Sequence, residues 1–221
     1  MLRSLPTALL LLTFLSAGCH YSGWGPRISG SGNVIDSERQ LSEFHGVSLA
    51  GGMTLDIEVG APQRVVIEAD DNLQEYITTR IEDGVLEIEF EASVSSESEL
   101  RAIISVPDLT SIDVAGSSKL SVFGVQGSSF ELDVAGSASG SIAGSVDELA
   151  IDIAGSAKLE LYELEAKRVQ IDIAGSGRAE ITAHETLDIS IAGSGVVTYR
   201  GRPNVTSSQA GSATIRAADS E

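Results

Sequence analysis

Four aspartates recur in the C-terminal half of the sequence, each two positions before the alanine of an Ala-Gly-Ser unit: Asp113, Asp133, Asp152 and Asp172. On neighbouring strands about 4.8 Å apart they would form a column of carboxylates. Hard cations such as Ca²⁺ bind several carboxylate oxygens, whereas Asp beside Gly more often accepts hydrogen bonds from the N–H groups of its own bend. We treat the column as a candidate outward face that binds a partner or a cation. The alternative, that each Asp only accepts hydrogen bonds within its own bend, stays open.

Small residues run beside this column. The alanines of the six units are Ala115, Ala135, Ala154, Ala174, Ala192 and Ala210, and each is followed by Gly and Ser. A flat stripe of this kind suits a partner or a second copy of the chain, although small side chains also simply follow a tight corner.

The spacing of the six units indicates how the chain would position these residues. The alanines are separated by 18 to 20 residues, and apolar residues stand five, three and one positions before most of them, as in Leu149, Ile151 and Ile153. Such alternation is typical of strands with one buried face. The glycines of the units would occupy the sharp bends, where only a small residue fits: Gly116, Gly136, Gly155, Gly175, Gly193 and Gly211. These features predict an all-β fold, a single-stranded parallel β-helix (β-solenoid), right-handed, with about 18 to 20 residues per coil in the C-terminal half.

Residues 27 to 107 lack this period but contain short strand-like runs, which we expect to form irregular first coils. Residues 70–81 are expected to include a helical turn, and the acidic stretch 93–99 is expected to be an unstructured loop.

The N-terminus has the pattern of an export signal. Residues 1–18 contain a basic start at Arg3, an apolar run and small residues before Cys19, the only cysteine of the chain. The ending LSAGC resembles a bacterial lipobox with Cys19 as the lipid attachment site. We predict a signal peptide over 1–18, a lipidated tether over 19–27, a folded domain over 28–216 and a polar tail over 217–221.

Charge limits the partners. The chain carries a net charge of −18, and removal of the predicted signal, whose only charged residue is Arg3, leaves −19. Such a surface repels nucleic acid, which we exclude as a partner. Lys119, Lys158 and Arg178 are expected to be scattered counter-charges to the aspartates.

No residue pattern points to catalysis or to a cofactor, and none outside the aspartate column points to a metal. The three histidines, His20, His45 and His184, lack neighbours at metal-ligand spacing, and no nucleophile or phosphate-loop motif occurs. Aromatic platforms for a saccharide are sparse, with Tyr162 alone as a candidate. We therefore predict no catalytic residues, no cofactor and no enzyme activity. The alternative left open is a β-helix enzyme that acts on an acidic polysaccharide with Ca²⁺.

Several segments resemble one known family. GSGNV at 30–34, ERQLSEFHGVSLAG at 38–51, DDNLQEYITTRIEDGVLEI at 70–88, the IDIAGSG series and the closing GVVTYRGRPNVTSSQAGSATIR follow in the order of the putative autotransporter adhesin head GIN domain family. The resemblance covers about residues 28 to 216. It implies a right-handed β-helix domain, often carried on exported lipoproteins, and supplies no catalytic or binding residues.

Together these observations predict an exported, lipid-anchored, non-catalytic interaction or adhesin-like module of the cell envelope. Its expected partners are the membrane, through Cys19, and a protein, glycan or second copy of the chain. His20 is not the Asp that resembles an inner-membrane retention signal, so the outer membrane is favoured.

Overall fold

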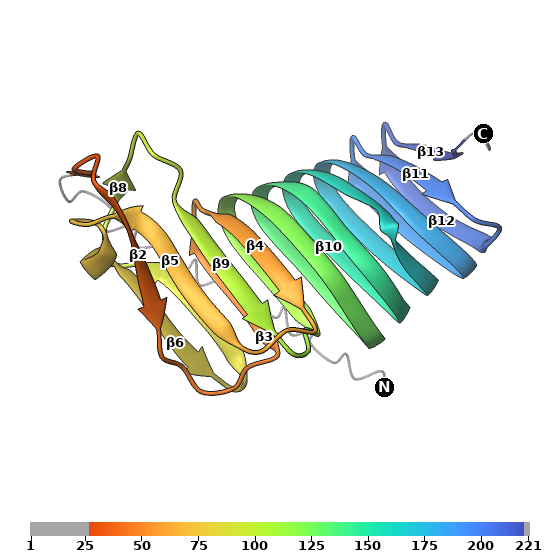
Figure 1. The fold of residues 1–221 in the computed structure, drawn as a ribbon. Coiled ribbons are helices and arrows are strands. Elements are labelled where there is room, and N and C mark those ends of the chain that lie inside the picture. The colour runs from red at the N-terminus through yellow and green to blue at the C-terminus, as the bar shows by residue number, and fades with distance from the viewer. Residues whose placement is uncertain (1–26, 219–221) are drawn as a thin grey trace, which may run out of the picture.

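A computed structural model describes residues 27–218 (Figure 1). The predicted signal peptide, Cys19, nearly all of the tether and the last three residues of the tail lie outside the described residues. Within residues 27–218 no helix has the length and apolarity needed to cross a membrane.

Strands make up most of the described chain, 77% of it. They are β1 (Ile28–Ser29), β2 (Val34–Arg39), β3 (Gly46–Gly51), β4 (Thr54–Val59), β5 (Arg64–Asp70), β6 (Ile77–Glu82), β7 (Val85–Phe90), β8 (Val94–Ser95), β9 (Arg101–Val106), β10 (Ser111–Gly193), β11 (Val196–Arg200), β12 (Asn204–Gly211) and β13 (Thr214–Ala217). One 3₁₀ turn, η1 (Gln74–Tyr76), precedes β6. The 83 residues of β10 are continuously extended and wind through successive passes that lie side by side (Figure 1).

The predicted fold class was wrong, because the sheet is mixed. β10 pairs in parallel with β3, β4, β11 and β12, but β2 runs antiparallel to β5, β5 antiparallel to β9, and β6 antiparallel to β7. The sheet wraps around its core in a nearly closed, barrel-like arrangement, so a single-stranded parallel β-solenoid does not describe it.

A short turn accounts for one of the antiparallel pairs. Asp83 and Gly84 both have positive φ, +49° and +79°, and they join β6 directly to β7. A two-residue Asp-Gly turn of this kind produces a hairpin, whose strands are antiparallel by construction.

The apolar positions of the AGS units face one continuous core. Leu149, Ile151 and Ile153 are all buried, as are their counterparts before and after them along β10. Parallel pairing in register sets equivalent positions side by side: Val114 lies beside Leu49 at the start of β10, whereas at its end Ile189 lies beside Ser207 and Ile191 beside Gln209. The aliphatic rows therefore end at β12, whose residues are exposed.

The AGS glycines meet at the bends. Gly155 has φ +135°, and a Cβ atom there would lie inside contact distance of the carbonyl oxygen of Gly136. The same relation links each later glycine of the series to the one before it, and Ser194 N donates to Gly175 O at 2.8 Å. The backbones can approach this closely because the corner residue has no side chain.

The N-terminal strands are fastened by a buried carboxylate. Asp70 is completely buried and accepts hydrogen bonds from Gly32 N, at 2.6 Å, and from the Ser96 hydroxyl. The adjoining Asp71 accepts from Ser31 Oγ, and Asn72 Nδ2 donates to Ser29 O at 2.9 Å. We call residues 70–72 the clasp. The expectation of a helical turn in 70–81 matches η1, whereas the stretch 93–99 contains the short strand β8, which pairs with β1.

Gly155→Ala is expected to lower the free energy of unfolding by about 3 kcal/mol, because the new methyl group meets backbone at a positive φ. Urea denaturation of the two proteins measures the difference. Gly177→Ala is the matched control, because a Cβ there meets only side-chain atoms of Ile173 and Ile153. Two other units already carry alanine at the equivalent position, Ala138 and Ala157. Equal losses in the two variants would contradict this account of the bends.

Candidate functional site

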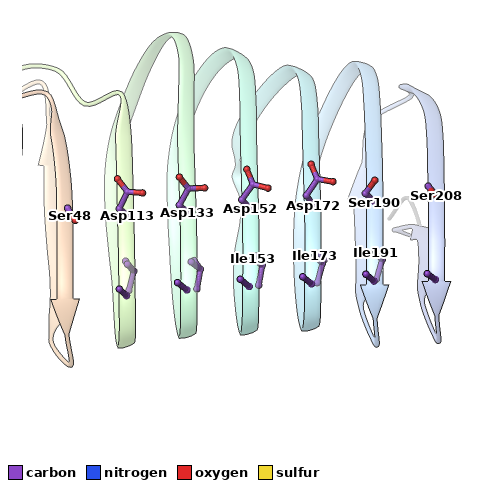
Figure 2. A pocket seen from close by; sticks show the side chains of 18 residues that line it. Ser48, Asp113, Asp133, Asp152, Ile153, Asp172, Ile173, Ser190, Ile191 and Ser208 are labelled. Carbon is purple, nitrogen blue, oxygen red and sulfur yellow. The ribbon is translucent and has the colours of Figure 1, made fainter. Parts of the chain in front are cut away.

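The four repeated aspartates lie in one row along a groove. Figure 2 shows Asp113, Asp133, Asp152 and Asp172 on neighbouring passes of β10, with their carboxylates on the same side of the sheet. Ser48 continues the row at one end and Ser190 and Ser208 at the other. The groove has a volume of about 540 Å³, and we call it the Asp groove.

Strand register builds the row. Asp113 pairs with Ser48 of β3, and Ser190 pairs with Ser208 of β12, so each new pass adds one polar side chain at the same height. Side chains alternate between the two faces of a strand, and the residue after each aspartate is buried while the alanine that follows it is exposed. The six AGS alanines therefore lie beside the carboxylates, and all six line the groove: Ala115, Ala135, Ala154, Ala174, Ala192 and, from β12, Ala210.

Ser48 was missed by the sequence analysis. It belongs to the run VSLAGG, which matches the pattern of IDVAGS with Ser in place of Asp. The match of Leu49, Ala50 and Gly51 to Val114, Ala115 and Gly116, their partners in the structure, was a signal that could have found it.

Repulsion within the row affects its protonation. Partial burial, together with a side-chain hydrogen bond and charge repulsion from Asp113, raises the pKa of Asp133. Partial burial and the charges of Asp133 and Asp172 raise the pKa of Asp152. In both cases the charged form is disfavoured, which is the expected result when carboxylates stand one strand apart.

The local contacts of the row differ from the capping pattern considered above. Among residues 27–218 no bend N–H donates to these four carboxylates, and Asp172 Oδ2 instead accepts from Gln170 Nε2 at 3.0 Å. In the same residues no three His, Cys, Asp or Glu side chains are placed to hold a metal ion together.

The basic residues do not neutralise the row. Lys119 Nζ lies 3.0 Å from Glu99 Oε1, and Lys158 Nζ lies 2.7 Å from Glu160 Oε1. The expectation that these side chains act as counter-charges to the aspartates was therefore wrong for both lysines. His184 also lies apart from the groove, with its Nε2 atom 3.8 Å from Glu165 Oε2.

Asp133→Asn is expected to raise the melting temperature at pH 7. A raised carboxyl pKa means that the folded protein binds a proton more readily than the unfolded chain, so the charged row costs stability as the pH rises through these pKa values. The gain should be less than about 1 kcal/mol for each neighbouring charge and should vanish below about pH 4. Thermal melts between pH 3.5 and 8 measure it.

Asp147→Asn is the control of opposite sign, because the side-chain hydrogen bond from Lys167 lowers the pKa of Asp147. That variant should be less stable than the parent protein at pH 7 and as stable as the parent in acid. Destabilisation by Asp133→Asn at pH 7 would contradict the repulsion and indicate that the Asp133 carboxylate makes a favourable contact when ionised.

Comparisons with solved structures show the same fold in other bacterial proteins. A putative adhesin from Bacteroides fragilis NCTC 9343 is 18% identical with a TM-score of 0.69, and the match covers 86% of this chain and 100% of that one. A putative adhesin from Parabacteroides merdae ATCC 43184 is 20% identical, with a TM-score of 0.50 and coverage of 88% and 100%. A protein from Parabacteroides distasonis ATCC 8503, described as a putative lipid binding protein, is 22% identical, with a TM-score of 0.50 and the same coverage.

No curated protein sequence matches the chain. A family model does, over residues 43–203, and its description is "Putative auto-transporter adhesin, head GIN domain". That range contains β3 to β11, the Asp groove from Ser48 to Ala192 and the bends that shape it. The resemblance seen in the sequence is confirmed, and the chain belongs to the family of autotransporter adhesin head GIN domains.

Proposed function

We propose that this protein is an exported, lipid-anchored and non-catalytic adhesin-like module of the cell envelope, and that it binds its partner along the Asp groove. Family membership supports the adhesin-like role. The export pattern of residues 1–18 and the single cysteine at position 19 support the anchor. Several acyl chains on one cysteine would hold a protein stably on a membrane.

The Asp groove is the observation that carries the proposal. It crosses every pass from Ser48 to Ser208, and its exposed alanines leave the space beside the carboxylates open. A partner that supplies hydrogen-bond donors or positive charge at strand spacing would also relieve the repulsion that raises the pKa values of Asp133 and Asp152. The groove therefore favours an extended partner that runs across the strands.

No observation favours the alternative, a Ca²⁺-dependent enzyme acting on an acidic polysaccharide. The groove presents chemically similar residues from each pass, whereas glycoside cleavage uses two carboxyl groups with different roles. We propose no second function.

Lysines placed in the groove test the binding face. The double variant Ala154→Lys and Ala174→Lys fills the space beside Asp152 and Asp172, and we expect at least tenfold weaker retention on cell-envelope fractions of the producing bacterium. Ala61→Lys, in the loop between β4 and β5 and outside the groove, is the control and should bind like the parent. Sedimentation of all three proteins shows whether the groove binds a second copy. Unchanged retention and unchanged mass of the double variant would overturn the groove as the binding face.

Anchoring and exposure have a separate test. Cys19→Ser is expected to move the protein from the membrane fraction to the soluble exported fraction, because the residue that would carry the lipid is gone. Protease treatment of intact cells, followed by an immunoblot, then reports whether the anchored parent faces outward. Membrane retention of the serine variant would refute the lipid anchor and leave the groove proposal standing.

A further inference from the structure

A second outward surface lies past the bends, on the strands that follow them. Eight positions after the AGS alanines stand Phe123, Ala143, Tyr162, Thr182 and Arg200. Thr182 pairs with Arg200, and its hydroxyl donates to Tyr162 O at 2.9 Å, so these positions are neighbours across the strands. The buried residues just before them, such as Val122, Ile142 and Leu161, place this row on the outer side of the strands, where Thr182 is itself buried.

Two arginines lie close to Tyr162. The guanidinium carbon of Arg200 lies 4.0 Å from the centroid of the Tyr162 ring, which is a cation–π contact. Arg216, one strand beyond Arg200, donates from Nε to Thr198 Oγ1 at 3.4 Å. Burial and the charge of Glu180 raise the pKa of Tyr162, while Arg200 and Arg216 act in the opposite direction, so both cations lie near the phenol.

These arginines differ from others in the protein. Arg64, Arg80, Arg101 and Arg168 each form an ion pair with a Glu or Asp. Arg178, Arg200 and Arg216 form none with any carboxylate of residues 27–218. Around Tyr162 the two cations, Arg200 and Arg216, outnumber the one carboxylate that acts on the ring, Glu180, so the stacked guanidinium can receive an anion locally although the chain carries a net charge of −18.

The opposite end of the row exposes an aromatic ring. The Phe123 residue is 56% exposed, the most exposed of the large hydrophobic residues described. Ala143 stands between Phe123 and Tyr162, which places the two rings two strands apart, or about 9.6 Å. That distance is close to the length of a disaccharide unit in an extended chain, and the face of a pyranose ring packs on an aromatic side chain.

We propose that this surface, the aromatic–arginine face, binds an extended polysaccharide that carries carboxylate groups. One sugar ring packs on Phe123, a carboxylate further along the chain accepts two hydrogen bonds from the Arg200 guanidinium, and Arg216 adds a second cation. Stacking on Tyr162 holds the guanidinium in place before the ligand arrives, which reduces the entropy lost on binding.

The row itself favours a polysaccharide over a protein partner. Phe123, Tyr162 and Arg200 follow one line across the strands with Ala143 and Thr182 between them, and Arg216 stands beside this line, opposite Thr198. None of these residues lines the Asp groove, so this site is separate from the one proposed above and can fail or hold independently.

Calorimetric titration of the full-length protein in detergent tests the proposal, with β-1,4-linked tetraglucuronate as the ligand and neutral cellotetraose of the same linkage as its match. We expect the acidic tetrasaccharide to bind at least tenfold more tightly than the neutral one. Arg200→Ala should weaken that binding at least tenfold, Arg200→Lys should recover part of the loss, and Phe123→Ala should weaken both ligands. Arg64→Ala, whose ion pair with Glu38 lies elsewhere, should bind like the parent.

Three results would overturn the proposal. The first is that tetraglucuronate does not bind at millimolar concentration. The second is that Arg200→Ala binds it as tightly as the parent at equal thermal stability, and the third is that Arg200→Ala loses self-association while its saccharide binding is unchanged. The last result would assign the anion to a second copy of the chain. The lysine variants of the Asp groove should leave tetraglucuronate binding unchanged, which separates this test from that of the proposed function.

Discussion

The close approach of glycine backbones at the bends is the constraint on which the other features depend. Each corner glycine lies against the carbonyl of the preceding one, so the series fixes which residue of one pass stands beside which residue of the next. The hydrogen bonds and the inward aliphatic side chains then follow in register. A shift by one residue would turn Leu149, Ile151 and Ile153 outward and bring polar side chains into the core, at a cost no surface contact could offset.

Strand register also explains why the functional groups on the surface of this protein are arranged in rows across the strands. A residue type repeated in each unit becomes a line of identical groups at strand spacing, as the aspartates do in the Asp groove. The repulsion that results stays tolerable because the carboxylates are partly solvated, and together with burial it raises the pKa of Asp133 and Asp152. Where the unit sequence varies, as at Phe123, Tyr162 and Arg200, the same geometry produces a line of unlike groups instead.

Much of the C-terminal half could be predicted from the sequence, since its apolar alternation and its glycines act locally. The direction of the N-terminal strands could not be read from that periodicity. The Asp-Gly pair at 83–84, between two strand-like runs, is the sequence signal of a hairpin and is inconsistent with an all-parallel fold. The role of Asp70 depends on contacts with residues 26 and 38 positions away, which no local pattern reveals. Phe123 directly follows the buried positions Leu120 and Val122, and apolar alternation identifies the buried side of a strand but does not indicate which outward residue is exposed to a partner.

The clasp bears on how the protein would respond to mechanical load. Tension applied to the chain ahead of Arg27 enters the fold at β1, which has only two residues and pairs with the equally short β8. Behind these strands the load passes to the Asp70 carboxylate, through Gly32 N and the Ser96 hydroxyl, and to the side chain of Asn72. Residues 28–39, which are held by these contacts and by the pairing of β2 with β5, are therefore the part of the described chain that tension reaches first, and the long wound strand β10 lies behind them.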